Sequence, residues 1–303
     1  MSTLSAWISA VRPRTLPLSL SGILVGLTLS NAQGAKTSLT AFACLFTTIC
    51  FQVLSNLAND LGDGMKGTDN AQRIGPTRAI QSGKISMRQM TFGVIALGIL
   101  SMLSSGLLIY SAPAIQTTSG IIFYILLAAL CVLSAITYTV GRKAYGYHGF
   151  GDVMVFLFFG VVAVSGTKHL FDSTFTYNEI FGALAIGAWS SMVLNLNNMR
   201  DIDNDEKSGK RTLVVILGAA QAKRYHYFLA MLGCVAWVIL LFRISNETHS
   251  YLIGLAGLPM LIIVKHLNNV SAIQEAKSFD PELKKVALST FLASIMCFAI
   301  SLF

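Results

Sequence analysis

Nine stretches of the chain are apolar enough and long enough to cross a lipid bilayer, and they constrain its fold more than any other feature. Charged residues, or clusters of Gly, Pro, Asn and Ser, separate one stretch from the next. The stretches cover residues 16–33, 39–59, 91–110, 119–141, 151–168, 180–199, 227–243, 250–267 and 286–303. Charged residues make up only 12% of the 303 positions, against about 25% in an average soluble protein. We therefore predict an all-α polytopic membrane protein, a bundle of nine transmembrane helices that forms a single domain over residues 1–303.

The basic residues favour one orientation of these helices in the bilayer. If the N-terminus is cytoplasmic, only Lys36, Lys168 and Arg243 of the 22 Lys and Arg residues fall on the opposite side. Cytoplasmic connections of membrane proteins carry an excess of Lys and Arg. We therefore interpret the net charge of +8 as a topology signal. It does not indicate a nucleic-acid partner, because the aromatic residues lie inside the apolar stretches and not beside the basic ones.

The segment before the first stretch and the cysteines both have simple interpretations. Pro13 and Pro17 suit the start of a helix, so RPRTLPLSLSG favours a permanent first span over a cleavable signal peptide. The five cysteines lie in apolar stretches without CxxC spacing. We interpret them as reduced packing residues.

Acidic residues are scarce, and half of them are concentrated in two short segments. Of the 14 Asp and Glu residues, seven lie in NLANDLGDGMKGTD and NLNNMRDIDNDEKSGKRTL, at the predicted cytoplasmic ends of the second and sixth stretches. Carboxylates at the edge of a membrane are costly and usually mark function. Polar residues at helix ends can also be simple interfacial caps, but two matched segments favour a functional site.

Helical geometry would arrange the polar residues of each segment as one row. The rows consist of Asn56, Asp60 and Asp63, and of Asn197, Asp201 and Asp205. Their spacings, i, i+4, i+7 and i, i+4, i+8, place each row on one helix face. The second row lies 141 residues after the first. This offset indicates a pseudo-repeat, with halves of about 1–141 and 142–303.

Two facing rows of carboxylates require cations between them. Oxygen ligands suit Mg²⁺, which usually shares its coordination shell with phosphate oxygens. Basic residues near the rows could complete a diphosphate site. These candidates are Lys66, Arg78, Lys84, Arg142, Lys143, Lys210 and Arg211. Anchoring to anionic lipid headgroups is the alternative role of the basic residues.

A diphosphate site at a membrane surface fits a polyprenyl diphosphate, whose tail partitions into lipid. Metal ions would stabilise the departing diphosphate, and a water-free pocket would protect the allylic cation. Transfer of the prenyl chain to an aromatic ring is the natural use of such a site.

The motifs resemble those of the UbiA-type intramembrane aromatic prenyltransferases. The two acidic segments, the Ser82–Lys84 step and Tyr138 before Arg142 carry this resemblance. AWISAVRPRTLPLSLSG, NDLGDGMKGTD and NNMRDIDNDEKSGKRTL are most similar to members that prenylate 1,4-dihydroxy-2-naphthoate in menaquinone biosynthesis. The similarity covers essentially the whole chain.

The resemblance implies a helix bundle around a central cavity in the bacterial cytoplasmic (inner) membrane, with its polar mouth on the cytoplasmic side. A polyprenyl chain, expected to be octaprenyl, would replace the carboxylate of 1,4-dihydroxy-2-naphthoate, giving demethylmenaquinone, CO2 and diphosphate. Two Mg²⁺ ions would bridge the diphosphate. The expected metal ligands are Asn56, Asp60, Asp63, Asp69, Asp201, Asp203 and Asp205. Of these, Asp69 and Asp203 lie off the two faces.

The resemblance also implies residues for catalysis, for binding the diphosphate and for binding the acceptor. Asp60, Asp63, Asp201, Asp205 and Tyr138 are the expected catalytic residues. Diphosphate contacts are expected from Asn56, Asn197, Lys66, Arg78, Lys84, Arg142, Lys143 and Lys210. Arg14 could face the acceptor carboxylate or a headgroup, and Arg200 could bind that carboxylate or orient Asp201. Tyr138 could line the cavity or belong to an interfacial aromatic belt. The histidines show no ligand spacing, and we assign them no catalytic role.

Two other classes of function share some of these features. Within the family, 4-hydroxybenzoate, homogentisate, chlorophyllide or haem could be the acceptor. A secondary transporter of an anionic substrate is a different class, but its polar site would lie near the midplane of the membrane. The acidic residues here are predicted at one membrane face.

Overall fold

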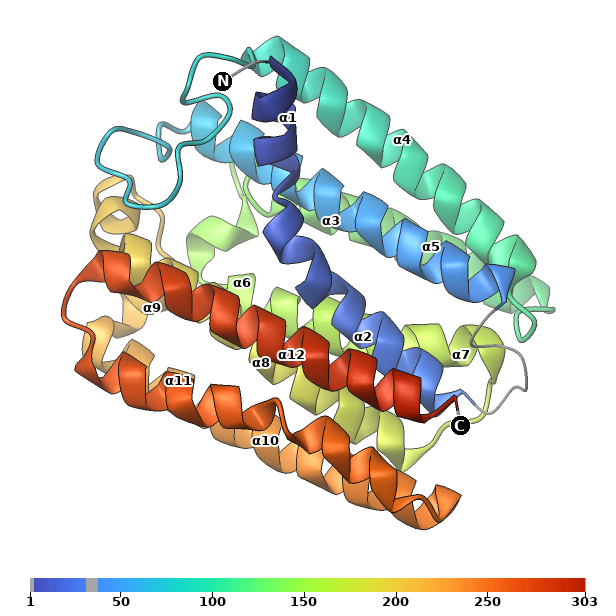
Figure 1. Cartoon of the computed structure of the whole chain (residues 1–303). Helices are drawn as coiled ribbons and strands as arrows, with labels where there is room; N and C mark the ends of the chain where they lie inside the picture. Colours follow the sequence, from blue (N-terminus) through green and yellow to red (C-terminus); the bar gives the residue numbers. More distant parts are fainter. Residues whose placement is uncertain (1–2, 31–37, 303) are drawn as a thin grey trace.

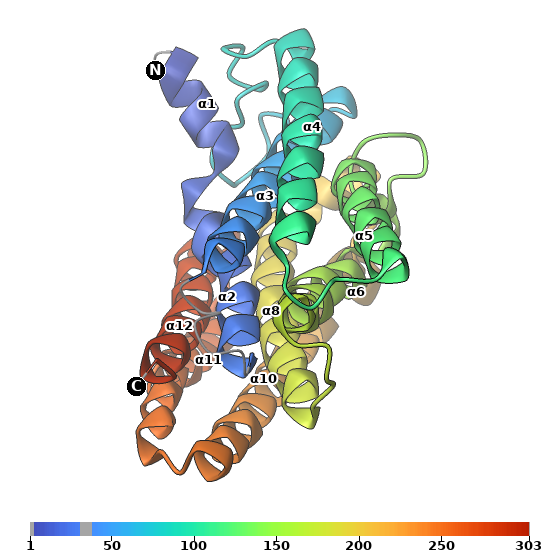
Figure 2. The ribbon, with the colours of Figure 1, turned by 90° about the vertical axis from the view of Figure 1, so that its right-hand side faces the viewer.

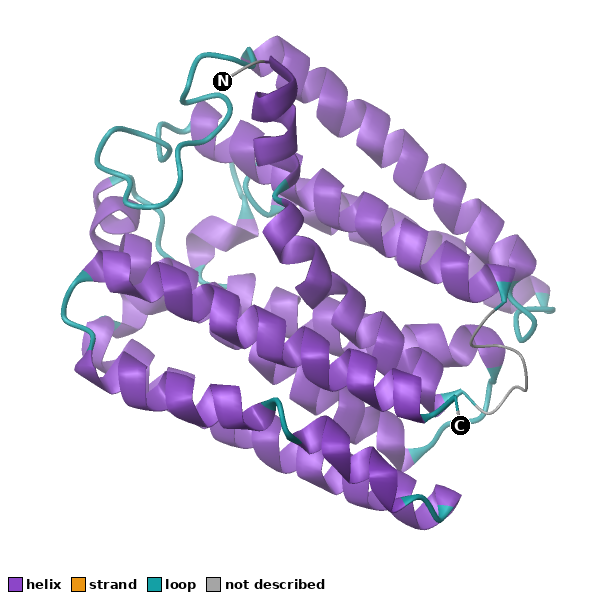
Figure 3. Ribbon diagram, in the orientation of Figure 1, coloured by secondary structure: helices purple, strands orange, loops and turns teal. Residues whose placement is uncertain are grey.

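The chain folds as a bundle of helices, and its computed structural model describes residues 3–30 and 38–302 (Figure 1). The described residues contain no strand (Figure 3). The α-helices are α1 (Thr3–Val11), α2 (Leu16–Leu29), α3 (Leu39–Met65), α4 (Met87–Ser111), α5 (Thr118–Thr137), α6 (Gly151–Val155), α7 (Thr167–Phe171), α8 (Tyr177–Lys207), α9 (Leu213–Leu217), α10 (Ala219–Thr248), α11 (Met260–Ala272) and α12 (Phe279–Ile300). The other helical segments are η1 (Pro13–Thr15), η3 (Tyr145–His148), η4 (Phe156–Gly166), η5 (Tyr251–Gly257) and η6 (Ala276–Ser278).

Eight segments of the described residues are long and apolar enough to span a membrane. They are Leu39–Met65, Met87–Ser111, Thr118–Thr137, Gly151–Phe171, Tyr177–Lys207, Ala219–Thr248, Tyr251–Ala272 and Ala276–Ile300. The all-α membrane fold is therefore confirmed, but the predicted count of nine is not. The difference is α2, whose 14 residues give a helix of about 21 Å. The predicted first span continued to residue 33, and its last three positions lie outside the described residues.

Local sequence signals start several of the long helices. Ser86 and Gln89 form a capping box at α4, and Thr176 and Glu179 form another at α8. Ser38 accepts a hydrogen bond from the backbone of the first turn of α3. These side chains satisfy backbone N–H groups that have no partner inside the helix.

The fifth predicted span is an irregular helix. It starts as α6, widens into the π-helix η4 and ends as α7. Gly160 lies against the backbone of α8, where an added Cβ would approach Ala183 O to 2.5 Å and Gly187 Cα to 2.9 Å. Widened helical turns of this kind are frequent at functional sites.

Helix α8 is the centre of the larger apolar core. It packs against α10, η4 and α12, and α12 also packs along α2. Trp189 of α8 and Trp237 of α10 are fully buried in this core. A second apolar cluster joins α1, α3 and α4 around Leu54 and Leu57. Figure 2 shows α3, α4 and α5 on one side of the bundle and α10, α11 and α12 on the other.

A chain of buried polar side chains joins four helices of the larger core. His226 Nε2 lies 2.8 Å from His266 Nε2, and His266 Nδ1 lies 2.7 Å from Glu282 Oε2. At its other end, His226 Nδ1 lies 3.1 Å from Asn195 Oδ1. These pairings give the buried ring nitrogens of His226 and His266 and the carboxylate of Glu282 hydrogen-bond partners on neighbouring helices.

Most acids of the two acidic segments lie on long helices, and Asp69 follows α3 in the connection to α4. Helix α3 continues past the predicted boundary at residue 59 to Met65, and α8 continues past residue 199 to Lys207. The connection between α3 and α4 lies at the same end of the bundle as α9 (Figure 1). Polar side chains from distant parts of the chain therefore meet at this end.

Candidate active site

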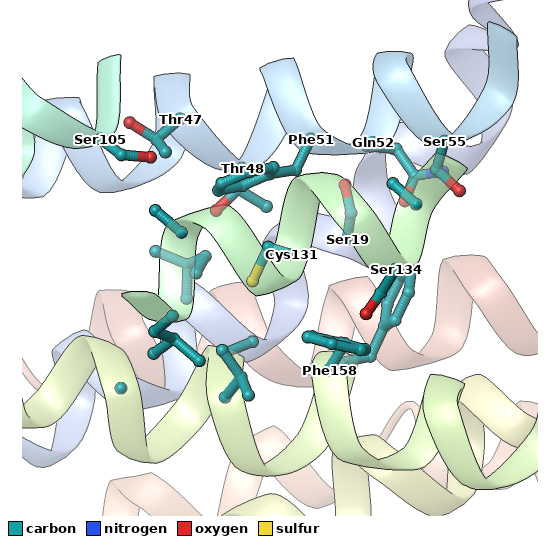
Figure 4. A pocket seen from close by; sticks show the side chains of 18 of the residues that line it. Ser19, Thr47, Thr48, Phe51, Gln52, Ser55, Ser105, Cys131, Ser134 and Phe158 are labelled. Atoms are coloured by element: carbon teal, nitrogen blue, oxygen red, sulfur yellow. The ribbon is translucent and has the colours of Figure 1, made fainter. Parts of the chain in front are cut away.

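An apolar cavity of about 320 Å³ lies between α2, α3, α4, α5 and the irregular helix α6–η4–α7. Along its length it is lined by groups such as Cys131 and Phe158 (Figure 4). Asn56, Asn59 and Tyr138 line it as well. Tyr138 therefore faces the cavity, and its ring packs edge-on against Tyr145 at a centroid distance of 5.3 Å.

The carboxylates at the end of α3 are buried and paired with basic groups. Asp60 accepts a hydrogen bond from Arg12, and Arg78 Nε lies 3.6 Å from the same oxygen. Asp63 accepts hydrogen bonds from Lys210 Nζ at 3.0 Å and from the hydroxyl of Tyr147 at 2.7 Å. The two acids are thus neutralised by different parts of the chain.

The connection after α3 folds back over these acids. Asp69 lies in it, and the Nε atoms of Arg73 and Arg78 are 3.2 and 3.8 Å from its carboxylate. Arg73 Nη2 also lies 3.6 Å from Asp201 on α8. Arginine side chains therefore link Asp60, Asp69 and Asp201 into one buried cluster.

The end of α8 contributes a second set of charges. Arg200 holds Asp201 through two hydrogen bonds, from Nε at 3.1 Å and from Nη2 at 2.6 Å. Asp205 is buried, whereas Asp203 is exposed. Of these two predicted metal ligands, only Asp205 is therefore buried beside the other carboxylates.

Burial and neighbouring charges shift several pKa values outside the spans. Burial raises the pKa of Asp69 to about 6. Burial, together with the nearby cations Arg12 and Arg73, lowers the pKa of Arg78 to about 9. Burial alone would lower the pKa of Lys210, but the carboxylates of Asp63 and Asp205 raise it above its ordinary value. Dense, opposed charges of this kind are typical of functional sites.

The donors in this cluster fit Mg²⁺ in kind, since they are carboxylate and amide oxygens. Both carboxylate oxygens of Asp69 are buried without a hydrogen-bond donor of good geometry. In the described part of the chain, however, no three Asp, Glu, His or Cys side chains are gathered closely enough to hold a metal ion. Arg and Lys side chains lie between the carboxylates instead.

The N-terminal segment is part of the site. Asn56 donates hydrogen bonds to Val11 O at 2.8 Å and to the hydroxyl of Thr15 at 3.1 Å. Arg12 has a φ of +52°, a conformation that is rare for residues other than Gly and tends to persist at functional sites. The turn at Arg12 places its guanidinium on Asp60.

Most of the predicted site residues lie together, and some do not. Those in or against the cluster are Asn56, Asp60, Asp63, Lys66, Asp69, Arg78, Asn197, Arg200, Asp201, Asp205 and Lys210. Arg142, Lys143 and Asp203 are exposed. Lys84 lies in the connection before α4. Arg14 is 44% exposed and lies 3.8 Å from Asp280.

Four residues of the site were not predicted from the sequence: Arg12, Arg73, Tyr147 and Asp280. Arg12 and Arg73 lie within the basic segments that were recognised, but nothing in their spacing distinguishes them from Arg14 and Arg78. Tyr147 and Asp280 are far from both acidic segments in the sequence. Only the folding of the chain brings them to the carboxylates.

The comparison with known proteins agrees with this arrangement. The sequence pattern of the UbiA prenyltransferase family matches residues 19–295. The chain belongs to the UbiA prenyltransferase family. This UbiA prenyltransferase is 39% identical over 296 residues to the 1,4-dihydroxy-2-naphthoate octaprenyltransferase of Haemophilus influenzae, covering 97% of the chain and 94% of the relative. The protein of the same name from Escherichia coli K12 is 38% identical over 298 residues, with 98% and 94% coverage.

A solved structure supports the fold of this UbiA prenyltransferase. A UbiA homolog from Archaeoglobus fulgidus, bound to DMAPP and Mg²⁺, superposes with a TM-score of 0.62 at 17% identity. The likeness covers 96% of this chain and 99% of the homolog. At this identity the comparison establishes a shared fold.

Proposed function

We propose that this UbiA prenyltransferase transfers a polyprenyl chain, of octaprenyl length, from its diphosphate to 1,4-dihydroxy-2-naphthoate. The observation that carries the proposal is the position of the charged cluster next to the apolar cavity. Asn56 and Asn59 line the cavity, and the next residue, Asp60, belongs to the cluster. A molecule with an anionic head and an apolar tail fits this arrangement. The acceptor and the chain length are supported by the names of the relatives.

The proposed reaction needs no base to remove a proton from the ring carbon that is prenylated. The allylic C–O bond breaks, and its electron pair leaves with the diphosphate. The ring carbon that bears the carboxylate forms a bond to the allylic carbon. The bond to the carboxylate then breaks, its electron pair returns to the ring, and CO2 leaves. The product is the reduced form of demethylmenaquinone.

Residues of the cluster bind the head of the donor. Arg12, Arg78 and Lys210, which pair with Asp60 and Asp63, are the residues that we propose to donate charge-assisted hydrogen bonds to diphosphate oxygens. Tyr138 presents its aromatic ring to the cavity, where a ring face stabilises positive charge on the allylic group. The apolar lining excludes water, which would otherwise capture the cation.

Mg²⁺, when bound, supplies charge that stabilises the departing diphosphate. Asp60 and Asp63 on α3, and Asp201 and Asp205 on α8, are the residues that would hold it. We propose two ions. The Archaeoglobus homolog is bound to Mg²⁺ together with DMAPP, which supports the use of this metal.

We further propose that the charged end of the bundle faces the cytoplasm and that the chain lies in the bacterial inner membrane. The distribution of Lys and Arg supports this orientation. Helix α2 is mostly buried and packs against α3, η4 and α12. We propose that α2 forms most of the first predicted span, residues 16–33, and so completes the nine spans.

A panel of acceptors tests the proposed function. Purified protein in detergent receives Mg²⁺, octaprenyl diphosphate and one of 1,4-dihydroxy-2-naphthoate, 4-hydroxybenzoate or homogentisate. We expect a prenylated product only with the naphthoate. Product from 4-hydroxybenzoate alone would refute the assigned acceptor, and failure with every acceptor would refute prenyl transfer to these rings.

A further inference from the structure

Asp280 connects helix α12 to the charged cluster, although it lies in neither acidic segment. It stands in the first turn of α12, where a carboxylate is favoured by the helix dipole. Its Oδ1 accepts a hydrogen bond from Arg200 Nη1 at 2.6 Å. Its Oδ2 lies 3.8 Å from Arg14 Nη1. One carboxylate thus joins α12, α8 and η1.

Arg200 makes four hydrogen bonds within the protein. The side chain is only 3% exposed. Its Nε and Nη2 hold the two oxygens of Asp201, and Nη2 also donates to Asn197 Oδ1 at 2.8 Å. Nη1 donates to Asp280. These bonds use four of the five N–H donors of the guanidinium, so the geometry of Arg200 is that of a support for Asp201.

We propose that Asp280 is a positioning residue, which acts through Arg200 to orient the carboxylate of Asp201. The guanidinium is planar and rigid, so the position of Nη1 determines how Nε and Nη2 present themselves to Asp201. Asp280 holds Nη1 and thereby aligns the pair of bonds on Asp201. The inference rests on the proposed function, in which Asp201 holds Mg²⁺ and the diphosphate.

The negative charge that holds Nη1 of Arg200 comes from α12, through Asp280. A Cβ added to Gly75 would lie 2.7 Å from Arg200 Nη2 and from Arg73 Nη2. The connection after α3 therefore packs against the same guanidinium. It contributes a second cation, Arg73, to Asp201, whereas Asp280 contributes the negative charge on the far side of Arg200. Removal of Asp280 would leave Nη1 of Arg200 without its carboxylate partner, while Arg73 and Arg200 still share Asp201.

The experiment compares Asp280→Ala with Asp280→Glu and with Glu275→Ala. Glu275 is an exposed acid in the connection before α12, so its variant removes the same charge from the same region. Two properties are measured in detergent: the Mg²⁺ concentration for half-maximal turnover, and the thermal stabilisation of the protein by Mg²⁺ with inorganic diphosphate. The KM values for both substrates are determined in parallel.

We expect Asp280→Ala to raise the half-saturating Mg²⁺ concentration by about tenfold or more, as outer-shell partners of metal ligands commonly do. The same variant should lose most of the stabilisation by Mg²⁺ with diphosphate, while the acceptor KM stays unchanged. Asp280→Glu should recover part of both properties, and Glu275→Ala should behave like the unmodified protein.

Two results would overturn the inference. The first is an unchanged Mg²⁺ dependence and unchanged stabilisation in Asp280→Ala. The second is a change confined to the acceptor KM, which would make Asp280 part of an acceptor gate at Arg14. Failure of the proposed function would give a different result from failure of this inference. The unmodified protein would then make no product, but stabilisation by Mg²⁺ with diphosphate could still be compared between the variants.

Discussion

Tyr147 joins three charged groups at the end of α3. Its hydroxyl donates to Asp63 and lies 2.6 Å from the hydroxyl of Thr68. The ammonium group of Lys66 lies 3.7 Å from the ring centroid, and that of Lys210 lies 5.2 Å from it. The aromatic ring thus holds two cations beside Asp63 while its hydroxyl orients the carboxylate.

Replacing Tyr147 by Phe separates these two effects. Tyr147→Phe keeps the ring under Lys66 but removes the donor to Asp63. A hydrogen bond to a charged group contributes about 1.5–3 kcal/mol, so we expect kcat/KM for the prenyl diphosphate to fall roughly tenfold or more. Tyr110→Phe is the matched control, since Tyr110 is 90% exposed on α4. Equal kinetics for the two variants would contradict the role of the hydroxyl.

The acids themselves are predicted to be indispensable. Asp60→Ala and Asp201→Ala should each reduce turnover below detection, because each removes a carboxylate of a different row. Both variants should still insert into the membrane, which is checked by their amount in the membrane fraction. Glu206→Ala, at an exposed position of α8, should retain activity. Near-normal turnover in either Asp variant would refute the role of the rows.

For single residues, the sequence predicts the acidic residues of the site better than the basic residues that pair with them. The spacing of Asp60, Asp63, Asp201 and Asp205 follows from helical periodicity, which is a local property. Arg200, next to Asp201 in the sequence, is the local exception. The other cations that neutralise these acids come from the N-terminal segment, from the connection after α3 and from Lys210. Which cation reaches which acid depends on how these segments fold over the bundle, and no local pattern encodes that.

Among the elements, the ends of α3 and α8 determine where the carboxylates lie. Hydropathy detects the apolar part of each helix, and so it places their ends near residues 59 and 199. The helices continue into polar sequence, where the apolar signal stops but the backbone hydrogen bonds do not. For the same reason hydropathy did not distinguish the short α2 from a full span or the widened η4 from a regular helix.

Gly62 allows the last turn of α3 to approach the segment after α5. A Cβ at this position would lie 2.5 Å from Thr139 Oγ1 and 2.6 Å from the backbone carbon of Thr139. Thr139 is fully buried, and its hydroxyl donates to Ala58 O at 2.9 Å. The approach therefore fixes the helical turn that carries Asp60 and Asp63.

A larger residue at this position should displace that turn. Gly62→Ala would normally favour a helix by about 1 kcal/mol, but here we expect a lower Tm and reduced turnover because Thr139 cannot move freely. Gly106→Ala on α4 is the control, since no atom lies within 4 Å of its added Cβ. Gly106→Ala should be neutral or stabilising. A stabilised and fully active Gly62→Ala variant would contradict the close approach.

In the whole molecule, the site lies where two groups of helices meet. The cavity is bounded by α3, α4 and α5 and by the irregular helix that packs on α8. Its charged neighbour is built from the ends of α3 and α8, which we propose to be equivalent positions in two pseudo-repeat halves. The amino-acid sequence alone predicts a membrane protein and a site at the end of the bundle where α3 and α8 end. The cavity, however, depends on packing between helices distant in the sequence.

The orientation in the membrane can be tested with cysteine labelling. Gln116 precedes α5 and Lys143 follows it, and both are exposed. In bacterial cells, a membrane-impermeant maleimide should label Gln116→Cys from outside, and it should label Lys143→Cys only in inverted vesicles. The five native cysteines are replaced in both variants. The reverse labelling pattern would place the charged end outside the cytoplasm.

The most direct test of the central claim is a balance of the reaction with 1,4-dihydroxy-2-naphthoate labelled in its carboxylate carbon. Purified protein is incubated with this acceptor, octaprenyl diphosphate and Mg²⁺, and labelled CO2, diphosphate and prenylated product are measured together. We predict that the three appear in equal amounts and that EDTA abolishes all of them. A prenylated product that retains the labelled carbon, or full activity in EDTA, would contradict the account.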